Sequence, residues 1–554
     1  MPFHPAATLI YYWAVLSRYQ IIVSTLSPLK QKFFRVLWLT NVVSLVGTLM
    51  HDVGAAWFMT TLAPTPFMVA MVQTASTFPF FILALPAGAL ADIIDRRRLL
   101  LTAQIWMLVA SVLLGVLTVS GMTTPLVLLV LTFFLALGAA VNGPSWQAII
   151  PELVERNELP SAIALGSVGF NLARAVGPVI GGLIVAAFGP GVTFLLNGVS
   201  FLGVVVVLKK WKRVEQMSTL KEERLVSAMR AGIRYIRHAQ EVRSALIHSL
   251  LLSFFCSSLP ALLPILSKKY LGLGSSGFGI LLGFFGFGAL LGAPFLPILR
   301  QRLSLNVIVL VGTNLFALAA ATIANLHSFV FIAIAMVAGG MAWLILISTL
   351  IAVIQSVIPS WVRGRVLSVH MLSFFGGLAG GSALFGFIAG GIGIPSTLNV
   401  VAGCLVVTSA VTWNYKLKSG EELDLSPSMH WPSLAVSCQP DFDDGPVLVV
   451  VEYRIDPEKA QGFADSMYAL KTIRRRDGAI RWNLFHDLTD PGHYIESYIV
   501  ESWGEHLRQH ERITVADREI EKSVLSFHLD GRPPKVMHFL AEPLPVKNKR
   551  TDIS

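Results

Sequence analysis

The chain has 554 residues, of which 54% are hydrophobic, and its mean hydropathy is +0.66. Soluble globular proteins are about 45–50% apolar, so this composition excludes an ordinary soluble protein and indicates a protein of the lipid bilayer. The net charge of +10 divides into +15 over residues 1–415 and −5 over residues 416–554.

The basic residues of the first part lie at the ends of apolar runs rather than along one face, and this distribution excludes nucleic-acid binding. Only three cysteines occur, Cys256 and Cys404 within apolar runs and Cys438 in a polar stretch. The sequence therefore indicates neither a disulfide framework nor a metal site, and no cofactor is expected.

Residues 1–30 form an N-terminal extension whose apolar run, Ala7 to Val23, is interrupted by Arg18. The run lacks the basic start and the small-residue cleavage site of a signal peptide, and it is a poor membrane span. An interfacial segment and a translation start placed too far upstream both remain open.

From Phe33 onward, apolar stretches long enough to cross a bilayer recur twelve times. A helix needs about 20 apolar residues to cross about 30 Å of hydrocarbon. The expected spans are 34–60, 67–90, 99–120, 123–148, 161–188, 190–208, 244–266, 277–299, 305–325, 328–353, 366–390 and 395–414. They form an N-terminal six-helix half, residues 31–208, and a C-terminal six-helix half, residues 244–415.

The loops between spans alternate in charge. The odd-numbered loops contain only Lys268 and Lys269, whereas the even-numbered loops carry arginines such as Arg156 and Arg363. Because positive residues concentrate on the cytoplasmic side, we expect both termini to be cytoplasmic in a multi-pass protein of the bacterial inner membrane.

Residues 209–243 form a basic cytoplasmic linker between the two halves, with ten basic residues against four acidic ones. Its apolar residues recur at near-helical spacing. A basic amphipathic segment suits the surface of an anionic lipid leaflet, so we expect the linker to lie there.

The two halves resemble each other in sequence. Gln147-Ala-Ile-Ile-Pro151 at the end of the fourth span recurs as Gln355-Ser-Val-Ile-Pro359 at the end of the tenth. The stretch from Gly88 to Arg98 likewise has a partial copy from Gly292 to Arg302. Two matches at equivalent places predict an internal repeat.

The turn between the second and third spans packs two acids and three arginines into a few residues: Gly88, Asp92, Asp95, Arg96, Arg97 and Arg98. So short a turn requires antiparallel helices, and a breakable ionic latch between its acids and arginines is expected to act as a conformational gate. An ordinary positive-inside loop is the alternative, because the charge rule alone would supply the arginines.

At these residues the chain resembles the major facilitator superfamily. That superfamily's signature for this loop is matched by Gly88, Leu90, Ala91, Asp92, Arg96 and Arg97, although Asp95 replaces a usual glycine. The resemblance implies twelve helices in two halves that alternate access to a central cavity. In the fifth span, residues that look like the core of the superfamily's antiporter motif are Gly177, Pro178, Gly181 and Gly182.

The segment from Asn142 to Pro178 is similar to the transmembrane secretion effector branch, which includes enterobactin-exporter-like carriers. Members of that branch export siderophores, drugs and related small molecules, or have unknown substrates. The resemblance therefore favours export. It runs from about residue 28 into the C-terminal region.

Ionisable residues at membrane depth are costly and carry a functional hypothesis by default. Asp52, past the middle of the first span, and Arg174, near the middle of the fifth, are expected to face one cavity and to couple transport to protons. A static Asp52–Arg174 pair, or two residues solvated by cavity water, is the alternative. Asn142, Gln147 and Asn171 are candidate substrate contacts.

After the last span, residues 416–445 form a polar linker, residues 446–545 a soluble domain and residues 546–554 a tail. The domain is expected to have the order β-α-β-β-α-β, with one helix spanning Leu507 to Val524. This order suits a ferredoxin-like α+β sheet and resembles the small dimeric barrels of the antibiotic-biosynthesis monooxygenase group, so the domain is a candidate for dimerisation.

Trp482, Asn483, His486 and His510 of that domain are of types that the monooxygenase group uses, but their spacing is not diagnostic. No catalytic residue is assigned. The sequence favours a proton-coupled exporter of small molecules that is not an enzyme, and a membrane-tethered enzyme or sensor is the alternative.

Overall fold

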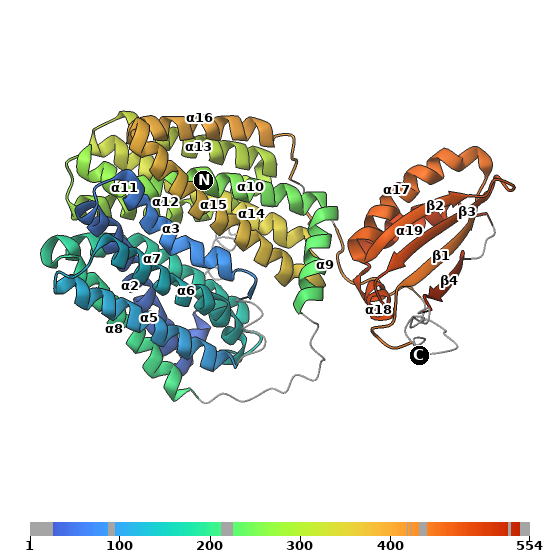
Figure 1. Cartoon of the computed structure of the whole chain (residues 1–554), viewed down its shortest axis with the longest axis horizontal. Coiled ribbons are helices and arrows are strands. Elements are labelled where there is room, and N and C mark those ends of the chain that lie inside the picture. The colour runs from blue at the N-terminus through green and yellow to red at the C-terminus, as the bar shows by residue number, and fades with distance from the viewer. Residues whose placement is uncertain are drawn as a thin grey trace, which may run out of the picture. The chain divides into compact units, whose positions relative to one another are not determined.

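A computed structural model of the chain describes residues 26–86, 95–211, 225–417, 419–420, 423–431, 440–529 and 533–542 (Figure 1). The chain forms two compact units. The first unit comprises residues up to 220, 245–352 and 368–417, and the second comprises residues 221–244, 353–367 and the chain from 418 onward.

Twelve helical stretches are long and apolar enough to cross a membrane, which confirms the predicted number of spans. The first six are α2 (Lys32–Leu62), α3 (Pro66–Leu83), α5 (Arg96–Val119), α6 (Pro125–Leu153), α7 (Leu159–Phe188) and α8 (Pro190–Lys210). The second six are α10 (Gln240–Cys256) with α11 (Ser258–Lys269), α12 (Ser275–Arg302), α13 (Leu305–Asn325), α14 (Phe329–Val357), α15 (Arg363–Ile392) and α16 (Ile394–Thr412). A short 3-10 turn, η1 (Ser27–Lys30), precedes α2.

Equivalent turns in the two halves end their helices in the same way. Gly189 joins α7 to α8 with a φ of 80°, and Gly393 joins α15 to α16 with a φ of 85°. Only glycine adopts this left-handed conformation without strain, and proline follows within the first turn of the next helix in both places. This correspondence agrees with the predicted internal repeat.

Large apolar side chains cover the outside of the helices of the first unit. Without lipid around the protein, Phe387 is 70% exposed and Phe188 is 72% exposed. Water would disfavour so much apolar surface, whereas hydrocarbon accommodates it. The first unit is therefore a multi-pass membrane domain.

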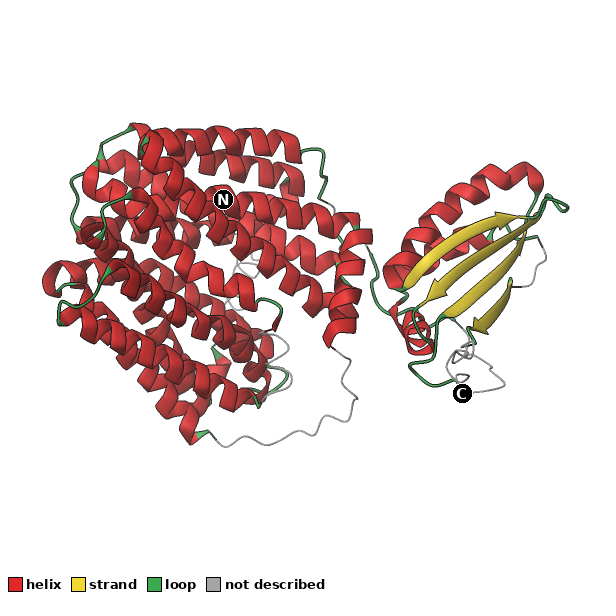
Figure 2. Ribbon diagram, viewed as in Figure 1, coloured by secondary structure: helices red, strands yellow, loops and turns green. Residues whose placement is uncertain are grey.

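In the second unit, a four-stranded sheet is made of β1 (Val447–Arg454), β2 (Ala479–His486), β3 (His493–Val500) and β4 (Lys535–Leu540). The strand order is β2-β3-β1-β4, and all neighbours are antiparallel. The accompanying helices are α17 (Ala460–Asp477), α18 (Trp503–Arg512) and α19 (Val515–Leu525), with the short turn η3 (Pro457–Lys459) before α17. Figure 2 shows these helices on one side of the sheet.

The prediction of one helix from Leu507 to Val524 was wrong, because α18 ends at Arg512 and α19 begins at Val515. Thr514 accepts a hydrogen bond from the Asp517 backbone, and the Asp517 carboxylate accepts one from the Thr514 backbone. This capping box starts a new helix and satisfies backbone groups that a continuous helix would have paired internally.

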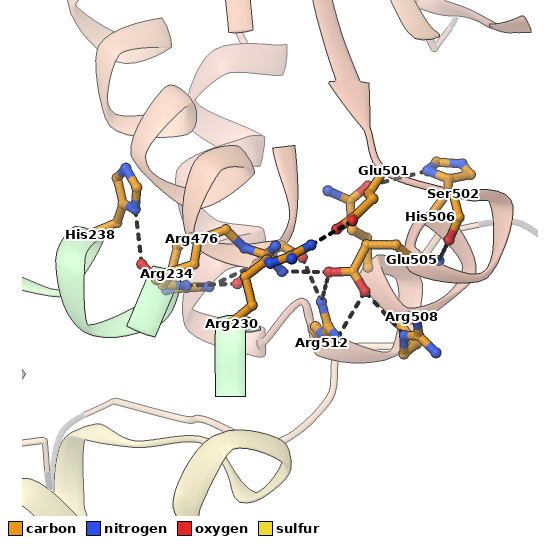
Figure 3. Close-up of polar contacts among 12 residues, drawn as sticks. Arg230, Arg234, His238, Arg476, Glu501, Ser502, Glu505, His506, Arg508 and Arg512 are labelled. Carbon is orange, nitrogen blue, oxygen red and sulfur yellow. Dashed lines mark hydrogen bonds and ion pairs between the residues drawn. The ribbon is translucent and has the colours of Figure 1, made fainter. Parts of the chain in front are cut away.

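The linker helix α9 (Leu225–His238) also belongs to the second unit. The sequence suggested a helix on a lipid surface, but Ala231 and Tyr235 of α9 are 2% and 3% exposed. Within the unit, α9 packs against α17 and the turn η2 (Ser360–Val362), and its arginines pair with Glu501 and Glu505 (Figure 3). A protein surface therefore covers the part of this helix that was expected to face lipid.

The sheet domain has an apolar core and, beside it, a buried ionic cluster. Val447, Val449 and Val451 of β1 pack against Phe463 and Met467 of α17.

The Arg474 guanidinium is 5% exposed and lies 3.2 Å from the Glu496 carboxylate and 3.0 Å from the Glu521 carboxylate. Trp482 also donates to Glu496, and Trp431 donates to Glu521. Although burial raises it, Arg474 and the hydrogen bonds from Trp431 and His430 hold the pKa of Glu521 below its ordinary value.

Replacing Arg474 with alanine should destabilise the sheet domain by about 3–5 kcal/mol, because Glu496 and Glu521 would remain buried without their cation. Hydrogen exchange of the β1 and β3 amides in the full-length protein measures the change. Arg518 is exposed on α19, so Arg518→Ala is the matched control. Equal exchange in the two variants would contradict a structural role for the cluster.

Candidate functional site

A cavity of about 180 Å³ lies between the two halves of the membrane domain. Its lining residues come from α2, α3 and α11: Asp52, Ala56, Val69, Val72, Gln73, Ser76, Thr77, Pro260, Ala261 and Pro264. Asp52 is the one ionisable residue among them, and its side chain is exposed. The cavity thus joins a carboxylate of the first half to a helix of the second.

The α3 wall of the cavity is polar because Gln73, Ser76 and Thr77 follow the three- and four-residue spacing of one helix face. The Ser76 hydroxyl donates to the Val72 carbonyl at 3.0 Å, and the Thr77 hydroxyl donates to the Gln73 carbonyl at 2.8 Å. Because each hydroxyl proton is already used in one of these bonds, the two hydroxyl oxygens can act only as acceptors toward other groups.

The α11 wall lies just after an interruption of the seventh span. α10 ends at Cys256, α11 begins at Ser258, and Pro260 and Pro264 have no N–H to donate to the preceding turn. The Ser257 and Ser258 hydroxyls donate to the carbonyls of Phe254 and Phe255 at 2.7 and 2.8 Å. Interrupted helices at membrane depth are typical of transporter binding sites, because freed carbonyls can meet a substrate or an ion there.

Beyond the cavity, lysines of α11 bind the end of α2. The Lys268 amine donates to the Thr60 carbonyl at 3.1 Å and to the Thr61 hydroxyl at 3.3 Å. The Lys269 amine donates to the Pro64 carbonyl at 3.0 Å. These bonds join the two halves at one end of the helices.

Helices α7 and α12 also join the halves, by a close backbone approach. A Cβ atom added to Gly182 would lie 2.9 Å from the Gly279 Cα, and one added to Gly286 would lie 2.9 Å from the Ala175 Cα. Small residues permit such contact between membrane helices. The halves are therefore in contact beside the cavity as well as beyond it.

Arginines hold the opposite end of the helices by bonds inside each half. Arg96 pairs with the Glu152 carboxylate at 3.0 Å and donates to the Ala148 carbonyl at 3.2 Å, both in α6. In the second half, Arg300 of α12 donates to the Ser348 carbonyl of α14 at 2.9 Å. The repeated sequence thus makes comparable bonds in both copies.

A family model described as transmembrane secretion effector matches residues 23–545. The chain belongs to this family of major facilitator transporters. Its match includes the sheet domain as well as the twelve spans. The transporter is therefore a membrane carrier and not an enzyme.

Two relatives of this chain are named as transporters. The transporter is 27% identical over 391 residues to the Staphyloferrin A transporter of Staphylococcus aureus, covering 70% of this chain and 96% of the relative. It is 24% identical over 405 residues to the multidrug efflux pump Tap of Mycobacterium bovis, covering 71% of this chain and 95% of the relative. These likenesses support transport of small molecules.

Among solved structures, a bacterial homologue of the human lysosomal transporter Spinster, inward-facing and unoccupied, shares the fold. The TM-score is 0.57 at 14% identity, over 70% of this chain and 97% of that chain. The part of this chain that aligns with that structure, or with either relative, is about as long as the stretch that contains the twelve spans.

The structure places the two predicted proton-coupling residues apart. Asp52 lines the cavity, whereas the Arg174 guanidinium lies 5.8 Å from the centre of the Phe285 ring, over α12. No ion pair joins Asp52 to Arg174 within the described part of the transporter. His51, the neighbour of Asp52 in sequence, is buried against Phe194 and is not among the residues that line the cavity.

Two of the gate residues, Gly88 and Asp92, lie outside the described residues. Asp95 accepts a hydrogen bond from the Arg98 backbone at 2.8 Å and so caps α5. Arg97 donates to the carbonyls of Leu208 and Lys209 at the end of α8. The partners that the structure gives Arg96 and Arg97 thus lie on α6 and α8, rather than within the turn. The gating role remains a prediction.

The antiporter-like residues serve as contact surfaces of α7. Cβ atoms at Gly177 and Gly181 would meet Leu49 and Met50 of α2, and Gly182 faces α12. Pro178 lies inside α7 and is buried. Helix α7 thereby packs closely against α2 in its own half and against α12 in the other half.

None of the three candidate substrate residues lines the cavity described above. Asn142 accepts from Gln104 at 3.0 Å, Gln147 is exposed, and Asn171 donates to the Ser167 carbonyl of its own helix. Their role stays a prediction. The sequence signal that was missed is the pair Pro260 and Pro264 within the seventh span, which marks the helix interruption.

The four polar residues singled out in the sheet domain do not converge. Trp482 donates to Glu496, Asn483 is exposed, His486 stacks on Tyr494, and His510 packs on Trp431. Their arrangement gives no support to an oxygenase site.

Replacing Gly182 with valine should destabilise the purified transporter by about 1–3 kcal/mol, because the added atoms overlap the α12 backbone. Thermal unfolding in detergent, followed by tryptophan fluorescence, measures the loss. Gly403 is exposed on α16, and a Cβ there would meet nothing within 4 Å, so Gly403→Val is the control. If both variants unfold at the wild-type temperature, the α7–α12 contact is not tight.

Proposed function

We propose that this transporter is a proton-coupled exporter of small molecules that works by alternating access. The observation that carries the proposal is Asp52, a lone carboxylate among the lining residues of a cavity between the two halves. An ionisable residue at membrane depth is costly, and such residues usually mark a substrate or proton pathway. Arg174 remains a second coupling candidate through its position near the middle of α7.

In the proposed cycle, Asp52 takes up a proton from one side and releases it to the other while substrate moves in the opposite direction. The carboxylate is negative when unprotonated and neutral when protonated, so the cavity prefers different occupants in the two states. Exchange of a proton for a substrate at one site couples their movements.

The charge of the loops supports an orientation of the transporter in the membrane. The arginine-bearing end is assigned to the cytoplasm, with both termini on that side of a bacterial inner membrane. The lysines that bind the end of α2 then close the external end. A cavity of 180 Å³ is smaller than the about 300–1,000 Å³ of ligand sites, so substrate entry needs the halves to separate further.

The proposed substrates are siderophores, drugs or secondary metabolites. The names of the staphyloferrin A transporter and the multidrug efflux pump support this class. The cavity lining includes the acceptors of a carboxylate and two hydroxyl oxygens, together with the Gln73 amide, which can both donate and accept. It therefore suits a substrate that carries hydrogen-bond donors.

Asp52→Asn should reduce proton-driven uptake into everted vesicles by at least tenfold, because the amide cannot release a proton. Accumulation of a fluorescent drug in vesicles with an acidic lumen is the measurement. Glu155 is an exposed carboxylate outside the spans, so Glu155→Gln should retain uptake. Wild-type uptake in Asp52→Asn vesicles would remove Asp52 from the mechanism.

We further infer that the sheet domain is ferredoxin-like and joins two copies of the transporter. The order β2-β3-β1-β4 with helices on one side supports the assignment. The other side presents apolar residues in register, Leu448 and Val450 beside Ile499 and Met537, with Phe539 50% exposed and Phe485 55% exposed. A second copy of the same face would cover this patch.

Val450→Arg should convert a dimer to a monomer in detergent, because it places a charge at the centre of the proposed contact. Light scattering with size-exclusion chromatography gives the mass. Leu488 is 95% exposed in the turn between β2 and β3, so Leu488→Arg is the control. A wild-type protein that is already monomeric at high concentration would contradict the dimer.

A further inference from the structure

Three polar groups in the second half of the membrane domain are buried without a hydrogen-bond partner among the described residues. They are the Ser249 hydroxyl of α10, the indole N–H of Trp343 of α14 and the Nδ1 atom of His370 of α15. Ser249 is 2% exposed and His370 is 3% exposed. A buried polar group without a partner costs free energy, and native structures rarely keep one without a reason.

Other serines of the seventh span do have partners. Ser253 donates to the Leu250 carbonyl at 3.0 Å, and Ser257 donates to the Phe254 carbonyl at 2.7 Å. A serine in a helix commonly satisfies its hydroxyl in this way, by bonding to the preceding turn. The Ser249 hydroxyl instead remains available to a group from outside its own helix.

Ser249, Trp343 and His370 line one small cavity of about 10 Å³, together with Cys256 and Phe374 and mostly aliphatic residues. About 10–15 Å³ is the space that a single water-sized group needs. The Trp343 indole can only donate, whereas a serine hydroxyl donates or accepts and a neutral imidazole does either according to its tautomer. The cavity therefore fits one oxygen atom that accepts a hydrogen bond from Trp343.

This small cavity lies on the same face of the seventh span as the Asp52 cavity. The lining residues that the span gives to the two cavities follow one another at intervals of three or four: Ser249, Ser253 and Cys256 for the small cavity, then Pro260 and Pro264 for the other. Such spacing places side chains along one helix face. The Ser257 and Ala261 N–H groups still donate to carbonyls four residues back, so the helical phase continues through the interruption. The two cavities are thus about one turn apart on this span.

Aromatic rings connect the small cavity to the first half. Phe374 lines the cavity, and the centre of its ring lies 5.3 Å from that of Phe375. Phe375 in turn stacks on Phe80 of α3, with ring centres 4.6 Å apart. Phe80 follows Gln73 and Thr77 at helical spacing, so it stands on the α3 face that lines the Asp52 cavity. The stack therefore joins the halves beside that cavity, and separation of the halves would break it.

We propose that Ser249, Trp343 and His370 form a substrate subsite of the second half, which binds a hydroxyl or carbonyl oxygen of the transported molecule. In this structure Phe374 and the stacked rings close the subsite. When the halves separate, the stack breaks and the subsite opens toward the Asp52 cavity. The subsite rests on the proposed alternating-access export, but not on the coupling of that export to protons.

The subsite narrows the class of substrate. The Asp52 cavity suits hydrogen-bond donors, whereas the indole of Trp343 requires an acceptor. A matching substrate is a small molecule that carries donor groups at one position and an oxygen acceptor at another. A molecule without oxygen would gain nothing from the subsite.

The first test measures whether the aromatic rings close the subsite, and it needs no substrate. Cys256 lines the cavity, so in the full-length Cys404→Ser, Cys438→Ser protein its alkylation by N-ethylmaleimide reports access. Phe375→Ala removes the stack on Phe80 and should raise the alkylation rate about fivefold. Leu384 is exposed on the same helix, so Leu384→Ala should leave the rate unchanged. An unchanged rate in Phe375→Ala would overturn a subsite closed by these rings.

The second test compares two fluorescent drugs, doxorubicin with hydroxyl and carbonyl oxygens and ethidium with amino groups but no oxygen. Downhill efflux from preloaded proteoliposomes, with equal pH on both sides, gives the KM of each drug. Trp343→Phe and Ser249→Ala should each raise the KM for doxorubicin about fivefold, because each removes one hydrogen bond. The KM for ethidium should not change. Phenylalanine can keep the ring contact of Trp343 with Phe374, so the variant tests the N–H group itself.

Trp106→Phe is the matched control, because Trp106 is exposed in the first half, donates to the Phe134 carbonyl and lines neither cavity. No proton gradient is applied, so a failure of proton coupling at Asp52 leaves this result readable. A wild-type KM for doxorubicin in both subsite variants would mean that the three groups bind water only, and would overturn the subsite. Equal rises for the two drugs would overturn it as well, because ethidium has no oxygen to bind there.

Discussion

Hydrocarbon offers no hydrogen bonds to a polypeptide, and this constraint governs the membrane domain. Backbone groups must be paired within helices wherever lipid surrounds them, so an interruption is tolerated only beside protein or water. In this transporter one cavity is lined by Asp52 and by residues of α11, the helix that follows the interruption after Cys256. These two costly features thus lie at the interface that opens and closes in the proposed alternating-access cycle.

The two ends of the helices are held by different chemistry. At one end Lys268 and Lys269 reach backbone carbonyls across the halves, and at the other Arg96 and Arg300 bind within their own halves. In the proposed cycle the bonds across the halves must break, and each bond to a carbonyl contributes only about 1.5–3 kcal/mol. Bonds within a half can be strong without opposing movement. This division suits a carrier made of two stiff halves.

The number of spans could be predicted because length and apolarity alone determine it, whereas contacts between helices could not. Asp52 faces a cavity, but its distance from Arg174 depends on the rotation of two helices, which sequence spacing does not fix. Glu152 as the partner of Arg96 is 56 residues away and was missed for the same reason. Two local signals, by contrast, were present in the sequence and could have been used: the Thr514 capping box and the prolines of α11.

The linker shows how a correct pattern can lead to the wrong partner. Its basic amphipathic character was evident, and both an anionic lipid surface and an acidic protein surface satisfy it. Charge balance favours the second: residues 416–554 hold 23 acidic residues against 18 basic ones, and two of those acids bind Arg230 and Arg234. The basic residues of the linker therefore serve a contact as well as topology. The contact thus involves the segment that connects the two halves in the chain.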